Sequence, residues 1–545
     1  MTVTEDAPVS ELVAPAPSTP ASSPSGLVAV LSSGDHKLVG RLWIVAALAQ
    51  LLLVLGASLY VAAMRLDLAG LTKLTDSPSD WFSQIVTYRA IGGTFLVLLP
   101  ITIGLATVIV PLQVGASTIA FPRAAAAAVW GYLVGSGLVI GAYSIDGGPF
   151  GTSLDGVRLF VAGLGLVVVS ELLAWICIMT TVVTLRAPGM TLARTPLFSW
   201  SVLMAGAVWL LTLPVLVAML VITYVFVRYL GEDSASIYAR ISWVFGPPAV
   251  YAFALPVLGF IATVVPVFSA TRHHLHRFAR TAIAAVGALV IGGWALPSFV
   301  GASTPWLYKL PWVAVSFLIL IPVLALVGLW AATLRNGQVT LASPLLFAAS
   351  ALLMLLVGLL AGAVQAIEPI KTLVDGPATS LYGTSWTTAV ASYVLLSLAI
   401  ALLGGITFWA PKLIGRGLRE GAARGVAALL LVGTVLWSFP DLVSGLLGQG
   451  GDIPGPVAEN VTAIEGLNAV SLAGGLFLAL AFLGFLGLVV QAIRGHEGVG
   501  DDPWSGHTLE WATSSPPPAG NFASLPEITS EAPLYDARHQ EASAQ

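Results

Sequence analysis

Charged residues are scarce in this chain of 545 residues, because Asp, Glu, Lys and Arg together make up only 9% of it. Soluble globular proteins carry roughly 25% charged residues, so the composition excludes a soluble globular fold. Cysteine is rarer still, since Cys177 is the single one. A lone thiol excludes a disulfide framework and any metal site built from several thiolates.

Histidine is absent from every long apolar stretch of the chain. All seven histidines lie in the connecting segments or the tails: His36, His273, His274, His276, His496, His507 and His539. Imidazole is a common protein ligand of haem iron and copper. The sequence therefore predicts that the apolar segments hold no such metal through histidine.

Apolar residues dominate what is present, with 57% hydrophobic composition and a mean hydropathy of +0.91. Twelve stretches are long enough to cross the ~30 Å hydrocarbon core of a bilayer as helices. We therefore expect an all-α polytopic membrane protein with twelve transmembrane helices, surrounded by lipid. The stretches are 41–64, 86–112, 124–144, 158–184, 197–227, 242–269, 280–302, 311–334, 343–366, 385–409, 424–447 and 467–492.

Basic residues gather in the segments on one side of these predicted helices. Examples are Arg41, Arg123, Arg194, Arg277 and Arg416, whereas the opposite segments carry most of the acids. The positive-inside rule then places both termini in the cytoplasm, with the chain in the plasma membrane. A net charge of -4 argues against a nucleic-acid partner, which would need a basic surface.

Three parts follow from composition along the chain. Residues 1–34 are rich in Pro, Ser and Ala and predict a disordered N-terminal tail, and residues 35–495 form the membrane domain. Residues 496–545 have a composition similar to the first segment and predict a disordered cytoplasmic tail.

Short motifs at the ends of the predicted helices resemble subunit I of haem-copper terminal oxidases, the cytochrome c oxidase family. They are Asp35-His-Lys-Leu-Val-Gly-Arg-Leu-Trp43, Val110-Pro-Leu-Gln-Val-Gly-Ala116, Ala120-Phe-Pro-Arg123, Leu185-Arg-Ala-Pro-Gly-Met-Thr191, Pro196-Leu-Phe198 and Trp409-Ala-Pro-Lys412. Their order and spacing extend the likeness over about residues 34–450. The resemblance implies the family's fold, twelve helices in three arcs around internal cavities, with two haems and copper held by six histidines.

None of those six histidines is present at the matching positions. The resemblance places the low-spin haem ligands at Arg89 and Ser392 and the high-spin haem ligand at Val390, and the copper ligands fall on Pro247, Leu296 and Pro297. An arginine has no lone pair to donate to iron at ordinary pH. From these replacements we expect no catalytic residue, no metal site and no bound cofactor, although the family carries two haems and copper.

Two charged residues lie inside predicted membrane helices, Arg89 and Glu171. Intramembrane charges are costly and are candidates for function. Arg89 is near enough to one end of its helix for its side chain to reach water. Glu171 lies near the middle of its helix, so we expect it to be protonated, paired or turned toward a water-filled cavity, and it forms a candidate polar site with Arg89.

Three functions remain open at this point. The first is a subunit-I-like membrane protein without catalysis, which acts as a structural, assembly or regulatory part of a respiratory complex together with other oxidase subunits. The second is a transporter of protons, ions or small molecules through the vacated cofactor cavities. The third is a working terminal oxidase that transfers electrons to O2, which would require ligands other than the six histidines.

Overall fold

A computed structural model describes residues 33–68, 70–71, 81–230, 235–245, 249–273, 275–294, 306–367, 381–451, 461–495 and 498–544. The predicted N-terminal tail, residues 1–34, lies outside these residues except for its last two positions. Within the described residues the chain is helical and contains no named strand.

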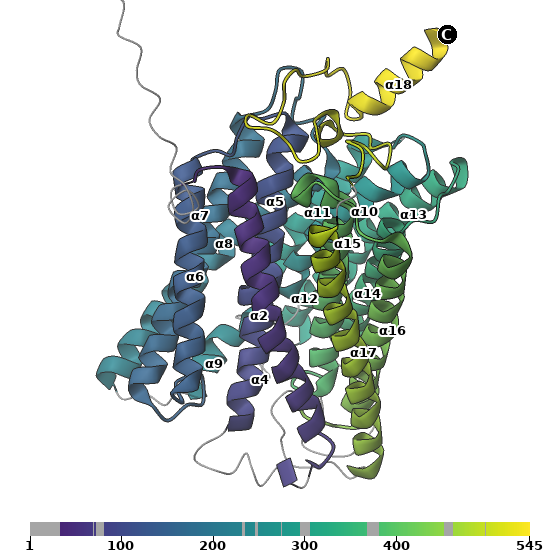
Figure 1. The fold of residues 1–545 in the computed structure, drawn as a ribbon. Helices are drawn as coiled ribbons and strands as arrows, with labels where there is room; N and C mark the ends of the chain where they lie inside the picture. Colours follow the sequence, from purple (N-terminus) through teal and green to yellow (C-terminus); the bar gives the residue numbers. More distant parts are fainter. Residues whose placement is uncertain are drawn as a thin grey trace, which may run out of the picture.

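Long helices run side by side and form a bundle that spans the length of the molecule (Figure 1). They are α2 (His36–Met64), α4 (Trp81–Ile91), α5 (Leu99–Val114), α6 (Pro122–Ser144), α7 (Leu154–Thr184), α8 (Leu197–Val225), α10 (Ala254–Phe268), α11 (His276–Trp294), α12 (Trp306–Leu318), α13 (Leu320–Asn336), α14 (Ser343–Gln365), α15 (Ser385–Ile414), α16 (Glu420–Leu446) and α17 (Val461–Arg494). Shorter elements are the π-helices η1 (Gly92–Leu98) and η2 (Phe226–Leu230), α9 (Ala235–Ile241), the 3₁₀-helices η3 (Ser242–Val244), η4 (Ala249–Phe253) and η6 (Leu509–Ala512), and α18 (Pro533–Ala544).

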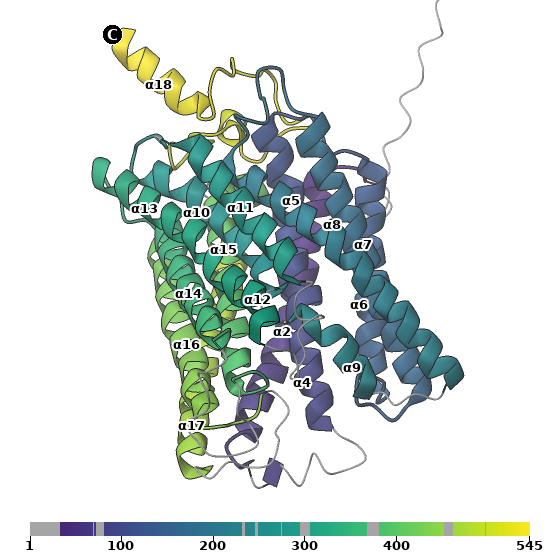
Figure 2. The same ribbon diagram turned by 180° about the vertical axis from the view of Figure 1, so that it is seen from behind.

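The predicted spans agree with these helices. Eleven helices of the described residues are long and apolar enough to cross a membrane. The remaining predicted span, 280–302, corresponds to α11, which begins at His276 and is described as far as Trp294. The twelve-helix prediction is thus confirmed in its architecture, and Figure 2 shows the same bundle from behind, with α8, α11 and α12 nearest the viewer.

Glycine allows the closest approach between α2 and α5. A Cβ atom on Gly40 would lie 2.6 Å from the carbonyl oxygen of Gly104, and one on Gly104 would lie 2.8 Å from that of Gly40. Lipid tails are as apolar as the side chains of a membrane helix, so the hydrophobic effect does not drive two such helices together. They associate largely by tight packing between small residues of this kind. These two glycines therefore fix the distance between the first and second spans.

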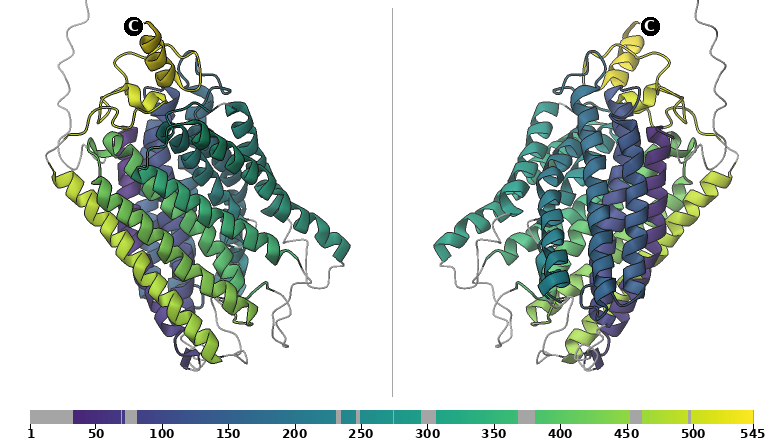
Figure 3. Two further views of the ribbon diagram at one scale, coloured as in Figure 1. Left: turned by 90° about the vertical axis from the view of Figure 1, so that its right-hand side faces the viewer. Right: turned by 90° about the vertical axis from the view of Figure 1, so that its left-hand side faces the viewer.

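The C-terminal segment, residues 498–544, is packed, although the sequence indicated a disordered tail. It lies across one end of the bundle in Figure 1 and in both side views of Figure 3. Leu509 and Glu510 have no exposed surface, and Trp511 is 3% exposed. The prediction was wrong because the segment is held by groups that are distant in sequence and leave no local periodic pattern.

Polar side chains from the bundle hold this segment. The Lys412 ammonium donates to the carbonyl oxygens of Asp501 at 2.9 Å and Thr513 at 2.6 Å. Lys37 donates to the Asn521 amide oxygen at 3.2 Å, and Asn521 in turn donates to the carbonyl of Ala116 at 2.7 Å. Lys37 and Lys412 therefore lie at the end of the bundle that the C-terminal segment covers.

A buried ion pair ties α2 to α16 at the opposite end of the bundle. The Arg65 guanidinium lies 2.8 Å from the Asp441 carboxylate, and both side chains are at most 8% exposed. The Asn468 amide of α17 donates to the Arg65 carbonyl at 2.8 Å. Three helices that are far apart in sequence are thereby joined at one point.

Candidate functional site

A cavity of about 540 Å³ lies among α2, α4, η1, α15, α16 and α17. Both predicted low-spin haem positions, Arg89 of α4 and Ser392 of α15, line it. These two positions were identified from separate sequence motifs, and in the structure they line the same cavity. Its volume falls in the range of about 300–1,000 Å³ that is usual for small-molecule sites.

The π-helix η1 shapes one wall of this cavity. It begins at Gly92, directly after α4, and its wider turns end where α5 begins at Leu99. Arg89, Gly93 and Thr94 all line the cavity from this stretch. A π-helical segment inside a membrane helix is uncommon and is found frequently at functional sites.

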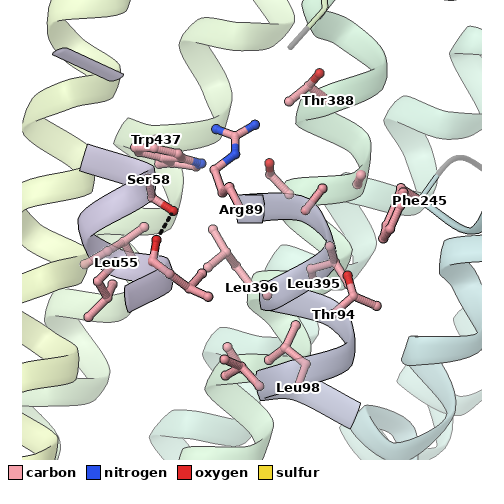
Figure 4. A pocket seen from close by; sticks show the side chains of 18 of the residues that line it. Leu55, Ser58, Arg89, Thr94, Leu98, Phe245, Thr388, Leu395, Leu396 and Trp437 are labelled. Carbon is pink, nitrogen blue, oxygen red and sulfur yellow. Dashed lines mark hydrogen bonds between the residues drawn. The ribbon is translucent and has the colours of Figure 1, made fainter. Parts of the chain in front are cut away.

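Arg89, Thr388 and Trp437 lie toward one end of the cavity, and Thr94 lies further along its wall. Figure 4 shows the Arg89 side chain directed toward the side where Thr388 and Trp437 lie, with Leu98 and Leu395 further along the wall. Thr94 is fully buried, and its hydroxyl oxygen has no hydrogen-bond partner among the described residues. The Ser58 hydroxyl is satisfied by the Val54 carbonyl at 2.8 Å.

The side chains at the two low-spin positions do not fit axial haem ligation. The ordinary axial ligands of haem iron are His, Met, Cys thiolate and Tyr. A guanidinium offers only N–H donors, and a serine hydroxyl does not belong to that ligand set. We therefore assign no redox step to Arg89 or Ser392.

The predicted high-spin position, Val390, is filled by packing. Val390 is fully buried, and a Cβ atom placed on Gly362 would lie 3.3 Å from its Cγ1 atom and 1.8 Å from the Tyr251 hydroxyl oxygen. That hydroxyl has no hydrogen-bond partner among the residues described. Gly362 is thus required here because Tyr251 and Val390 occupy the space beside it.

The three predicted copper positions, Pro247, Leu296 and Pro297, lie outside the described residues. Among the residues that are described, no three His, Cys, Asp or Glu side chains are grouped so that they could hold a metal ion.

The candidate polar pair of Arg89 and Glu171 does not form. Glu171 is on α7 with no exposed surface, and neither carboxylate oxygen has a hydrogen-bond partner within the described chain. It does not line the cavity that contains Arg89. The two residues therefore belong to separate places in the bundle.

A second polar centre, which no motif in the sequence indicates, lies beneath the C-terminal segment. The Glu510 carboxylate accepts from the Gln113 amide at 2.9 Å and from the Trp409 indole at 3.2 Å. The Gln113 amide oxygen also accepts from the Ser199 hydroxyl at 2.7 Å. Burial raises the pKa of Glu510 above its usual range, and these hydrogen bonds oppose that shift. No periodic signal in the sequence links Glu510 to Gln113.

Comparison with known proteins gives consistent matches over nearly the whole chain. The family described as cytochrome c and quinol oxidase polypeptide I matches residues 38–477. A probable cytochrome c oxidase subunit 1-beta of Nocardia farcinica is 32% identical over 541 residues, which cover 93% of this chain and 87% of that protein. The cytochrome c oxidase subunit 1 of Corynebacterium efficiens is 30% identical, with 93% and 89% covered.

A solved structure shares the fold. A haem-copper terminal oxidase dimer determined by cryo-electron microscopy matches with a TM-score of 0.67 at 14% identity, and the match covers 85% of each chain. At this identity the likeness shows the fold alone. It agrees with the arrangement predicted from the sequence motifs.

These matches contradict the prediction that the chain carries no cofactor. The relatives are cytochrome c oxidase subunits 1, and the matched fold is that of a haem-copper oxidase, so haem and copper are the family's ordinary content. The prediction was wrong because it took the loss of six histidines as the loss of all binding. The described residues show only that positions 89, 390 and 392 do not supply histidine ligands, because they are Arg89, Val390 and Ser392.

Proposed function

This chain belongs to the cytochrome c and quinol oxidase polypeptide I family, and from that premise we propose that it serves a respiratory membrane complex as a structural, assembly or regulatory subunit. It is an integral, multi-pass membrane protein. In this proposal the chain lies in the plasma membrane with both termini in the cytoplasm, and other oxidase subunits are its partners. The reduction of O2 is carried out by another subunit.

One observation carries the proposal. The family model matches residues 38–477, whereas Arg89, Val390 and Ser392 stand at three of the positions where the family resemblance calls for histidine. A retained scaffold preserves the surfaces that neighbouring subunits contact. At these three positions the chain does not supply the imidazoles that the family resemblance implies.

Affinity purification of the tagged, full-length chain from its native membrane tests this role. We expect oxidase subunits to co-purify, and we expect cyanide-sensitive O2 uptake to follow the amount of a catalytic partner in the sample. A reduced-minus-oxidised spectrum of the same sample measures haem content separately. O2 uptake by this chain alone, with reduced cytochrome c or quinol as donor, would overturn the proposal.

A second candidate function is transport, and it is favoured by two features of the membrane domain. One is the 540 Å³ cavity, and the other is the buried carboxyl group of Glu171. In proteoliposomes, a proton or ion flux that falls when Glu171→Gln is introduced would support it. Because Glu171 is not part of the cavity wall, an unchanged flux would remove this residue from any such route.

A further inference from the structure

We propose that the C-terminal segment, residues 498–544, is a releasable lid that controls the access of water to the covered ends of α5, α8 and α15. The inference goes beyond the subunit role proposed above and does not depend on it. Three features carry it: opposite charges on the segment and the bundle end, a limited apolar contact, and buried polar atoms without partners in the interface.

Opposite charges hold the segment on the bundle. Residues 498–544 contain seven Asp and Glu residues but a single Arg, and the bundle end that they cover presents cations. The Arg272 guanidinium lies 3.5 Å from the Glu531 carboxylate and 3.0 Å from that of Asp536, and the Arg272 side chain is 37% exposed. Lys412 donates to backbone oxygens of the segment. Salt weakens ion pairs that water reaches, so this part of the docking depends on ionic strength.

The apolar contact between the segment and the bundle is limited. Leu509 and Ile528 pack with Ala187 and Met190 in a cluster of four buried residues, which is separate from the main core. Trp511 is buried in the main core, and three partly buried side chains of the segment pack against that core: Trp504, Phe522 and Leu534. The segment thus brings few apolar side chains to the bundle, and hydrophobic burial gives the closed state a limited stability.

Two adjacent side chains of η6 are buried without full hydrogen bonding when the segment is docked. One carboxylate oxygen of Glu510, Oε1, accepts from Gln113 and Trp409, whereas Oε2 has no hydrogen-bond partner within the described chain. The indole N–H of Trp511 has no acceptor among the described residues. A buried polar atom without a partner costs free energy, and release of the segment into water removes that cost. The closed state is therefore opposed by two of the residues that it buries.

Release of the segment exposes polar groups at the ends of three membrane helices. Gln113 lies in the last turn of α5, Ser199 in the first turn of α8, and Trp409 near the end of α15, and all three are fully buried. The Ser199 hydroxyl donates to the Gln113 amide oxygen at 2.7 Å. With the segment in place, Glu510 takes the hydrogen bonds that water would otherwise accept from Gln113 and Trp409. Water therefore reaches these helix ends when the lid opens.

Thiol accessibility in the full-length chain tests the lid. Met190→Cys places a thiol in the apolar cluster beneath the segment, where Met190 is 3% exposed, and the buried native Cys177 gives a low background. The purified protein in neutral detergent is treated with a polar maleimide. We expect slow labelling of Met190→Cys, and a rate about threefold higher when NaCl is raised from about 0.05 M to about 1 M. Ser524→Cys, on the exposed surface of the segment, should be labelled rapidly at both concentrations.

Variants of the interface change the labelling rate of Met190→Cys in opposite directions. Arg272→Gln removes two ion pairs and should raise the rate about fivefold. Glu510→Gln keeps an oxygen for the two accepted hydrogen bonds but removes the charge of the buried carboxylate, so it should lower the rate about threefold at pH 8. Arg335→Gln is the matched control for Arg272→Gln and should leave the rate unchanged. Arg335 is exposed in the last turn of α13 and forms no ion pair with the described part of the segment.

Four results would overturn the inference. The first is labelling of Met190→Cys as fast as that of Ser524→Cys in low salt, because the segment would then not cover the bundle end. The second is a rate that neither salt nor Arg272→Gln changes, which would make the segment a fixed part of the fold. The third is faster labelling in Glu510→Gln, since the carboxylate would then hold the segment closed. The fourth is a rate increase that comes only with a lower melting temperature of the bundle, because unfolding would then expose the thiol.

Discussion

The carboxyl group of Glu171 lies within α7 with no exposed surface and no hydrogen-bond partner among the described residues. A buried polar group without a partner costs about 1–3 kcal/mol. We therefore expect Glu171→Leu to raise the free energy of unfolding by about that amount, measured as a higher melting temperature in detergent. Glu171→Gln keeps a polar group at the site and should change little. A lower melting temperature for Glu171→Leu would show that the carboxyl group has a stabilising partner.

In contrast to Glu171, the buried charges of Arg65 and Asp441 are paired with each other. Removing one partner from a buried pair leaves the other charge uncompensated, at a cost of about 3–5 kcal/mol. Arg65→Met and Asp441→Leu should each destabilise the protein to that extent in the same melting assay. The double variant should lose less than the sum of the two single losses, because each single loss already includes the same interaction between Arg65 and Asp441. Additive losses in the double variant would contradict this account.

At the scale of elements, the docked C-terminal segment contains His507, whose imidazole is harder to protonate in the docked segment than in water. The His507 ring packs against Tyr535, with ring centroids 4.8 Å apart. Burial, followed by the charge of Arg538, lowers the pKa of His507 from 6.5 to about 3. The docked segment therefore holds a neutral imidazole, whereas a released segment takes up a proton below about pH 6.5. The contribution of His507 to docking is therefore constant above about pH 6.5, and it weakens docking as the pH falls toward 3.

The lowered pKa of His507 predicts that docking weakens as the pH falls, and this can be measured. Between pH 7.5 and pH 5, docking should weaken by about 2 kcal/mol, seen as faster amide hydrogen exchange in residues 498–544 after correction for intrinsic rates. The raised pKa of Glu510 acts in the other direction, because its protonation favours the docked state as the pH falls. The pH dependence of exchange is therefore compared between the Glu510→Gln variant and the double variant Glu510→Gln/His507→Asn. Equal pH dependence in the two proteins would rule out His507 as the cause.

The membrane helices and the C-terminal segment differ in how far their structure can be predicted from the sequence. The membrane helices could be predicted because each one is apolar over its own length, so the signal is local. The docking of residues 498–544 could not, because its contacts join Lys412 to Thr513 and Gln113 to Glu510, about 100 and 400 residues apart. Arg89 and Ser392 were each found from motifs, but only the folded chain shows that they share a cavity.

At the scale of the whole molecule, charge is distributed unevenly between the two ends of the bundle. The end covered by the C-terminal segment carries Arg41, Arg186, Arg280, Lys412 and Arg494 at or near helix ends. The opposite end carries Asp146 and Asp155 beside the α6–α7 connection. Cytoplasmic segments of membrane proteins are enriched in Lys and Arg. The end with the C-terminal segment is therefore expected to face the cytoplasm.

Cysteine labelling tests this orientation, and the chain is well suited to it. Cys177, the only native thiol, is fully buried in α7 and should give a low background. Ser524→Cys places a thiol on the exposed surface of the C-terminal segment, and Leu154→Cys places one at the opposite end, where Leu154 is 50% exposed. A membrane-impermeant maleimide should label Leu154→Cys in intact cells and Ser524→Cys only in inverted vesicles. Labelling of Ser524→Cys in intact cells would show that the C-terminal segment lies outside the cell, which contradicts the orientation predicted from the basic residues.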